Sequence, residues 1–453
     1  MNDAVIASYR DTPVRLYQGN PLIEAIPREG DTKELYEKLR IKIPYSKDER
    51  NFSPMDRLQM IQQIYQAFQP WGKHIELVTK FGSAIRGGYV GRNPLDSQFL
   101  RDLSELSDCV QKRDSSFSGF QSGNPGAPGF AIVGASGSGK TSAVKRILTE
   151  LYPQKILHSE YKGETFHHLQ ITWMILTCPH DGSVKGLCIE FFREFDRITG
   201  ENTAAKFMRS TTDAMLTEMA LLARRHSIGA LVIDEIQNIS LAKSGGKERM
   251  LSFLANLMDS LNIPIVVVGI PSAVQVLSES FMTARRATGQ QGMTKMSNLP
   301  FDGGDWDIFL RGIWRYQWTA VETKLTEELS RVMYECSKGN VALALFLYAV
   351  AQRHAIENGA NGESEVITKE LILDAAHSEE FHLYANGWVD LDEKTAESTT
   401  RKVSAQGRKT TVATMSQPAR PKQKKAKSPE LWSIHDEPIE LLEKKGLLGY
   451  DEE

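Results

Sequence analysis

One short segment constrains the fold of this chain more than any other. Residues 134–141 read Gly-Ala-Ser-Gly-Ser-Gly-Lys-Thr and match the pattern G-x-x-x-x-G-K-[ST]. An apolar run from Phe130 to Val133 precedes the segment, and a helical pattern follows it. Glycines let a backbone wrap closely around phosphate, and the N–H groups of the loop and of the helix start point at the anion. The segment therefore predicts a phosphate-binding loop between a strand and a helix.

The side chains of this loop have expected roles. Lys140 should reach the β- and γ-phosphates of a nucleotide, and the Thr141 hydroxyl should coordinate Mg²⁺. ATP and Mg²⁺ are the expected cofactors. The residues predicted to bind the nucleotide are Gly134, Ala135, Ser136, Gly137, Ser138, Gly139, Lys140, Thr141 and Ser142.

A second apolar run, Ala230 to Ile233, ends in the acids Asp234 and Glu235. Asp234 fits a Walker B aspartate that holds Mg²⁺ through water, and Glu235 fits the base that polarises the attacking water. The alternative is a strand that merely ends in solvent-facing charge, which the preceding phosphate loop disfavours. An Asp-Glu pair is typical of ATPases of the AAA+ type, and less so of metabolite kinases and signalling GTPases.

Strand and helix patterns alternate after residue 128, which predicts an α/β fold with a parallel sheet covered by helices. The expected strands are Gly129–Val133, Leu169–Leu176, Ile228–Ile233 and Ile263–Gly269, and the expected helices include Ser142–Leu151 and Thr212–His226. We divide the chain into an extended N-terminal arm (1–53), N-terminal helices with a linker (54–128), the α/β core (129–320), a helical lid (321–389) and a flexible charged tail (390–453).

Composition excludes several classes of protein. Of the 453 residues 41% are hydrophobic and the net charge is −3, as in soluble globular proteins. The apolar runs are too short to cross a membrane, and no secretion signal is visible at the N-terminus, so a cytoplasmic protein is expected. The four cysteines show no paired metal spacing. The charges of the tail are segregated, with basic residues over 401–427 and acidic residues after 428, which favours contact with partners.

Three stretches resemble the TnsC/TniB family of AAA+ regulators from transposons, including CRISPR-associated transposons. One is Gly19-Asn-Pro-Leu-Ile-Glu-Ala-Ile-Pro27, and another is Ile85-Arg-Gly-Gly-Tyr-Val-Gly-Arg-Asn-Pro94. The third runs from the phosphate loop to the strand before Asp234. In addition, residues 337–346 look like the lid helix of that family.

The resemblance implies an AAA+ core with the strand order 5-1-4-3-2. Such proteins bind duplex DNA when ATP is bound and assemble there as rings or helical filaments, with hexamers or heptamers expected. They connect a target selector of the TniQ/TnsD type to a transposase of the TnsA/TnsB type, and ATP hydrolysis disassembles them. The apolar segment 438–448 in the tail is typical of a peptide that docks into a transposase groove, or of a frayed surface helix.

The resemblance also suggests roles for residues outside the phosphate loop. Val90 lies in the linker that contacts adenine in related ATPases, with an ordinary packed linker as the alternative. Arg285 or Arg286 is a candidate arginine finger for a neighbouring subunit, unless both belong to an exposed helix. Lys155 and Lys162 lie where a DNA-binding loop is expected, although either lysine alone is better described as a solvated surface residue.

Two positions depart from the family pattern. Ile270 follows the fourth expected strand, where the family has threonine, so the polar sensor-one group is in doubt and Ser272 is a weak substitute. Asn340 stands where many AAA+ proteins carry a sensor-two arginine. Two other functions remain open at this point. One is a replication initiator or helicase loader similar to Cdc6/ORC or DnaC, and the other is a STAND-type scaffold that binds ATP without DNA.

Overall fold

A computed structural model describes residues 4–112, 129–241 and 292–386, together with 249–250, 252–254, 257, 261 and 263–271. These residues belong to one structural unit that extends to Lys402. The predicted tail (390–453) and the candidate fingers Arg285 and Arg286 lie outside the described residues, as does Ser272.

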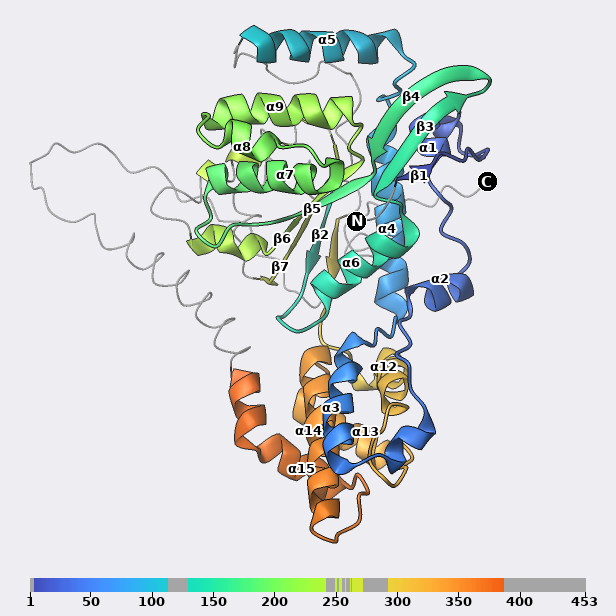
Figure 1. Ribbon diagram of the computed structural model, residues 1–453, viewed down its shortest axis with the longest axis vertical. Coiled ribbons are helices and arrows are strands. Elements are labelled where there is room, and N and C mark those ends of the chain that lie inside the picture. The colour runs from blue at the N-terminus through green and yellow to red at the C-terminus, as the bar shows by residue number, and fades with distance from the viewer. Residues whose placement is uncertain are drawn as a thin grey trace, which may run out of the picture. The chain divides into compact units, whose positions relative to one another are not determined.

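A parallel sheet of five strands forms the centre of the unit (Figure 1). Its strands are β2 (Phe130–Val133), β5 (Trp173–Thr177), β6 (Ala230–Asp234), β7 (Ile265–Gly269) and β8 (Met293–Lys295). They pair in the order β5-β6-β7-β2-β8, and each pair is parallel. Numbered along the chain, these five strands have the order 2-3-4-1-5, which confirms the predicted 5-1-4-3-2 arrangement read from the other edge.

The two faces of the sheet contribute to two separate hydrophobic clusters. Phe130 and Ile132 pack into the cluster that holds α4 (Gly72–Tyr89) and α6 (Lys140–Leu151). Ala131 and Val133 pack into the cluster that holds α7 (Val184–Thr199) and α9 (Thr212–Arg225). Successive side chains of a strand point to opposite faces, so an unbroken apolar strand fills both clusters.

Beyond α9 lies α5 (Ser97–Lys112), which begins a few residues after the predicted start at Asn93-Pro94 (Figure 1). Arg224 of α9 forms an ion pair with Asp102 of α5, and both side chains are buried. The short helix α8 (Thr203–Phe207) packs against α7. Helix α4 is not among the predicted elements.

The predicted strand 169–176 is two strands in two different sheets. β4 (Glu164–Ile171) forms a hairpin with β3 (Lys155–Tyr161), and β1 (Val5–Ile6) pairs in parallel with β3. Strand β5 begins only at Trp173. The buried residue between them, Thr172, binds the loop between the helix 140–151 and β3. Its N–H donates to the Gln154 carbonyl (3.0 Å), and its hydroxyl donates to the Pro153 carbonyl. These bonds turn the chain from one sheet into the other.

Residues 4–53 are not an extended arm, and this expectation was wrong. They contain η1 (Arg15–Tyr17), α1 (Pro21–Glu24), α2 (Thr32–Leu39) and η2 (Lys47–Asn51), and they bury apolar side chains such as Leu22 and Leu39. The polar residues that suggested a linker cap these helices. The Asn20 side chain accepts a hydrogen bond from Leu22 N–H, and Asp31 accepts one from Glu34 N–H.

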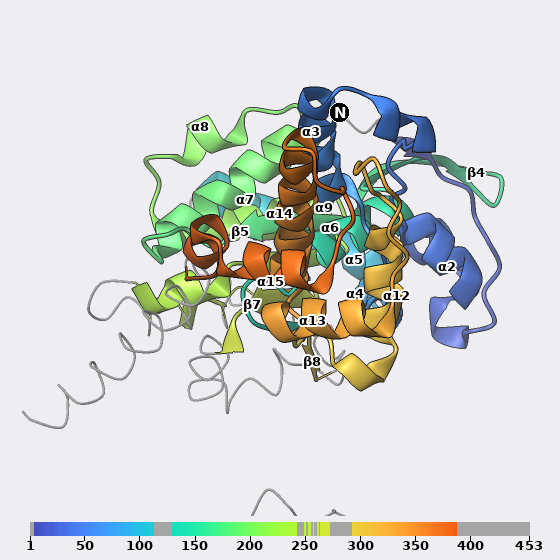
Figure 2. The same ribbon diagram turned by 90° about the horizontal axis from the view of Figure 1, so that it is seen from below.

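The helical part after the sheet is seen from below in Figure 2. It comprises η5 (Phe301–Gly303), α12 (Asp305–Trp314), α13 (Glu327–Ser337), α14 (Val341–Ala360) and α15 (Lys369–His377). We call residues 301–386 the lid. Helix α3 (Pro54–Met60) and η3 (Ile61–Gln66) pack on α14, where one continuous helical pattern over 54–70 was expected. A buried ion pair between Arg57 and Glu365 joins the two segments, so residues far outside the predicted 321–389 pack against the lid.

Candidate nucleotide site

The phosphate loop connects β2 to α6 as predicted. Gly137 and Gly139 have φ angles of 76° and 84°, in the left-handed region that glycine tolerates best. Gly134 is required for a different reason, because a Cβ there would lie 1.9 Å from the Met296 carbonyl oxygen. The loop is thus held between the helix start and the segment after β8.

Lys140 lies over its own loop. The Nζ atom donates to the carbonyl oxygens of Gly134 and Ala135, both at 2.8 Å. Ser138 is buried within the loop, whereas Ser142, in the first turn of α6, lines a neighbouring cavity. The ammonium group and the start of α6 therefore lie at the same loop, which suits the binding of a phosphate chain.

The two Walker elements meet directly. Thr141 Oγ1 donates to Asp234 Oδ2 at 2.8 Å, and Asp234 Oδ1 accepts from Glu235 N–H at 2.9 Å. Asp234 is buried at the end of β6, and Glu235 follows it half-buried. A hydroxyl beside a carboxylate is the set of oxygen donors that Mg²⁺ prefers, so Thr141 and Asp234 fit this ion. In the described part of the chain, no group of three His, Cys, Asp or Glu side chains is suited to a metal ion. The adjacent residues His167 and His168 therefore belong to no such group.

The lid contacts the phosphate loop through the first turn of α14. Asn340 caps this helix by accepting from Ala342 N–H (3.1 Å) and Leu343 N–H (3.2 Å). The same side chain donates through Nδ2 to the Ser136 carbonyl at 2.9 Å, and Ala342 N–H donates to the Gly137 carbonyl at 3.1 Å. The residue at the sensor-two position therefore joins lid and loop by hydrogen bonds, without a charge.

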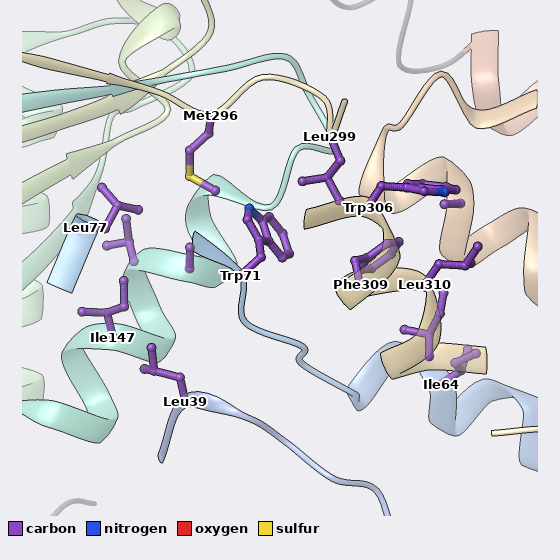
Figure 3. Packing of buried hydrophobic residues seen from close by; sticks show 14 of the residues in the cluster. Leu39, Ile64, Trp71, Leu77, Ile147, Met296, Leu299, Trp306, Phe309 and Leu310 are labelled. Carbon is purple, nitrogen blue, oxygen red and sulfur yellow. The ribbon is translucent and has the colours of Figure 1, made fainter. Parts of the chain in front are cut away.

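A cavity of about 430 Å³ opens beside the phosphate loop. Gly139 and Ser142 border it on one side, and α14 borders it through Val341 and Leu345. Its aromatic lining consists of Tyr65, Phe68, Trp71 and Phe309. Figure 3 shows the Trp71 indole between α6 and α12, with Phe309 of α12 on the side of the indole away from α6. The volume and the lining fit a flat heterocycle adjoining the phosphates.

His74 supports this aromatic wall from within. Its Nδ1 accepts a hydrogen bond from Trp71 N–H at 3.1 Å, and its ring lies 3.9 Å from the Trp71 ring and 5.0 Å from the Phe68 ring, between centroids. Complete burial lowers the pKa of His74 from 6.5 to about 3. The imidazole is therefore neutral at physiological pH.

Val90 lies elsewhere. It follows α4, and the hydroxyl of its neighbour Tyr89 donates to the Ser227 carbonyl at 2.9 Å, close to the start of β6. Gly139 lies beside Trp71 at the opposite end of α4. The structure does not bring Val90 to the phosphate loop, and the aromatic cavity replaces it as the candidate base site. A signal for this cavity is present in the sequence, since aromatic residues flank Gln69-Pro70 immediately before a long helix.

The remaining predicted residues are dispersed. Lys155 begins β3 and Lys162 follows its last residue, so the two lysines stand at opposite ends of this strand and form no cluster. Ile270 is buried after β7, which leaves its position without a polar group. Trp306, Trp314 and Trp318 are buried in the lid, and none of them is exposed for stacking on a base.

Comparison with known proteins agrees with this geometry. The sequence pattern of a family described as AAA domain matches residues 125–277. The chain therefore contains an AAA-family ATPase domain. In the described residues, no helix combines the length and the apolar character needed to cross a membrane.

Several solved structures are similar to this chain at low identity and with low TM-scores. ORC1 of Aeropyrum pernix in complex with DNA is 14% identical, over 61% of this chain and 63% of that chain, with a TM-score of 0.36. ORC2 of Aeropyrum pernix is 13% identical over 61% and 66%, with a TM-score of 0.38. A Walker-type ATPase of Pyrococcus abyssi is 14% identical over 65% and 76%, also with a TM-score of 0.38.

The match therefore spans less than two thirds of the two ORC chains, and scores this low do not assign a function. No curated protein sequence matches this chain.

Proposed function

We propose that this protein binds ATP with Mg²⁺ and hydrolyses the γ-phosphate bond at the site between α6, β6 and α14. The hydrogen bond of 2.8 Å between Thr141 and Asp234 carries the proposal, because it joins the two oxygen ligands expected for the ion. When bound, Mg²⁺ would neutralise charge on the phosphates. Lys140 would hold the β- and γ-phosphates, and Glu235 would accept a proton from the attacking water.

The base would occupy the aromatic cavity. Aromatic side chains bind a purine through its faces. Polar side chains also line the cavity, among them Gln66, Gln69 and Thr149, and these are available to the substituents of the ring. Phe68 and Trp71 are the residues expected to contact it. The proposal predicts that Arg285 or Arg286 completes the site of a neighbouring subunit.

We further propose that ATP switches the protein onto duplex DNA, where copies assemble as a ring or filament. This oligomer would connect a TniQ/TnsD-type target selector to a TnsA/TnsB-type transposase, and hydrolysis would release it. One observation supports this role. It concerns residues 19–27 and 85–94, the two stretches that resemble the TnsC/TniB family most specifically. They are bonded to each other, since Asn20 Nδ2 donates to the Tyr89 carbonyl (2.9 Å) and Asn93 Nδ2 to the Gly19 carbonyl (3.0 Å). Neither bond involves the nucleotide site, so the pair of segments forms a feature separate from generic ATP binding.

A replication initiator or helicase loader would use the same nucleotide site, and the AAA domain match supports it equally. The experiment must therefore separate ATP binding, DNA assembly and partner choice. We would image the full chain with linear duplex DNA by negative-stain microscopy, in ATP, in a non-hydrolysable analogue and as Lys140→Ala. Filaments or rings that need nucleotide and are absent in Lys140→Ala support the switch.

Binding partners are then tested on those assemblies. Retention of a TniQ/TnsD-type protein and a transposase on the ATP-bound form supports the transposition role. Retention of a replicative helicase instead supports the loader. Particles that ignore DNA with every nucleotide would overturn both, and would leave an ATPase that acts without DNA.

A further inference from the structure

The end of strand β7 lacks the polar side chain that the site needs. β7 lies between the strands that carry Asp234 and the phosphate loop, so its carboxyl end faces the phosphates. The residues there are Gly269, which has no side chain, and Ile270, which is apolar and buried. A group that holds the reacting water or its base must come from another element.

Gln237 reaches this place from the turn after β6. Glu235 adopts a left-handed backbone with φ of 56°, a conformation that a non-glycine residue seldom takes. The turn redirects the chain into η4 (Ile236–Leu241), and the Gln237 side chain then donates through Nε2 to Glu235 Oε2.

The other end of this carboxamide lies against β7. Gln237 Oε1 is 2.9 Å and Ile236 Cγ2 is 2.6 Å from the position that a Cβ on Gly269 would occupy, so these two side chains fill the space that a side chain at the end of β7 would otherwise enter. The turn is anchored independently by Asn238, whose N–H donates to the Glu235 carbonyl (3.0 Å) and whose Nδ2 donates to the Cys178 carbonyl (2.8 Å). The glutamine is thus held between the general base and the strand end.

We propose that Gln237 is a positioning residue for Glu235 and supplies the polar group that Ile270 lacks. The inference rests on the proposed hydrolysis of ATP. A carboxamide donor fixes the orientation of a carboxylate and cannot itself accept the proton of a water molecule. Gln237 therefore acts on the rate of hydrolysis through Glu235 and contributes little to nucleotide affinity.

The test compares steady-state ATP hydrolysis by the full chain with duplex DNA present. The variants are Gln237→Met, which keeps length and packing without the donor, and Gln237→Ala. We expect kcat to fall about tenfold in both variants. This is only a part of the roughly 10²- to 10⁴-fold rate enhancement that a general base supplies. KM for ATP and Kd for a non-hydrolysable analogue should stay within about twofold, because the phosphate ligands are untouched.

A double-mutant cycle identifies the path of the effect. In a Glu235→Gln background, Gln237→Met should lower the residual rate by less than about twofold, because the group it positions has been removed. Unchanged kcat in Gln237→Met, or a full tenfold loss in the Glu235→Gln background, would overturn the inference while the ATPase proposal stands. Absence of hydrolysis by the wild-type chain would overturn the ATPase proposal, and the inference with it. The analogue Kd and a thermal melt distinguish each of these outcomes from misfolding.

Discussion

The phosphate half and the proposed base half of the nucleotide site are built in different ways. The phosphate half consists of eight consecutive residues, 134–141, and a pair of acids at the end of β6. The base half is assembled from residues 65–71, 142–149, 309–313 and 341–345, which come together only in the folded chain. One half is a local motif, and the other is a product of tertiary packing.

This difference explains which parts of the site sequence reasoning could find. A contiguous loop dictates its own geometry, because Gly137 and Gly139 need left-handed backbone and α6 must begin at the next residue. The base cavity depends on where the lid packs, and no local pattern encodes that packing. The family resemblance predicts that Val90 contacts adenine, yet helix α4 of 18 residues separates Val90 from Trp71, a length of roughly 27 Å.

The largest expected effect tests the phosphate half alone. Lys140→Ala should raise the Kd for ATP more than about 100-fold and abolish hydrolysis, because it removes the only loop side chain expected to carry charge to the phosphates. The free energy of unfolding should change by less than about 1 kcal/mol, since the Lys140 ammonium donates to carbonyl oxygens of its own loop. Isothermal titration and thermal melts measure both quantities. Lys73→Ala, an exposed lysine on α4, is the control and should bind ATP normally.

The second prediction concerns pH and the base half. The pKa of His74 is about 3 in the folded chain and 6.5 in the unfolded chain, so the unfolded chain binds a proton over this interval and the folded chain does not. The free energy of unfolding should therefore fall as the pH drops below 6.5, by about 1.4 kcal/mol per pH unit, or about 2 kcal/mol at pH 5.

His74→Asn keeps an acceptor for Trp71 N–H and removes this titration. Burial also lowers the pKa of His168 and of His226 to about 4. The wild type and the variant must therefore be compared by the slope of the free energy of unfolding against pH. Urea unfolding between pH 5 and pH 8 gives both slopes. Identical slopes would show that His74 is not buried as a neutral group.

The third prediction separates the halves by ligand. Phe68→Ala should raise the Kd for ATP about tenfold, the loss of one stacking contact, and should leave the Kd for inorganic triphosphate within about twofold. Phe68 is half-buried at the cavity rim, which limits the cost in stability. Competition binding with both ligands measures this. An equal loss for ATP and triphosphate would mean that the base lies outside the cavity.

The fourth prediction concerns the contact between the halves. Asn340→Ala removes the cap of α14 and the bond to Ser136, so it should cost about 1 kcal/mol in stability and weaken ATP binding about threefold. Thr368→Ala removes the equivalent cap of α15, where Thr368 accepts from Leu371 N–H at 3.2 Å, and has no bond to the loop. This control should lose similar stability and no affinity. Equal affinity in both variants would show that the lid contact does not influence the nucleotide.

The core was predictable to a similar extent as the phosphate half. Fully apolar runs such as Ile265–Gly269 indicate doubly covered parallel strands from composition alone, and the strand order followed from the resemblance. The N-terminal region was not predictable in this way. Asn20 and Asp31 are as typical of linkers as of helix caps, and only the packing of Leu22 and Leu39 decides between the two. The ion pair between Arg57 and Glu365 joins residues that are 308 positions apart, a contact that no sequence period reveals.

The smallest expected effect concerns Val90, which follows α4 at the end away from the phosphate loop. Val90→Ala should leave the Kd for ATP unchanged within about 1.5-fold, because the linker packs at the start of β6 and not at the cavity. A loss of stability of about 1 kcal/mol is expected from the removed methyl groups of this partly buried side chain. Titration with ATP at a temperature well below the melting transition separates the two effects. A tenfold loss of affinity would mean that the base binds near Val90, at the end of α4 away from the aromatic cavity. The division of the site into a local half and an assembled half would then be wrong.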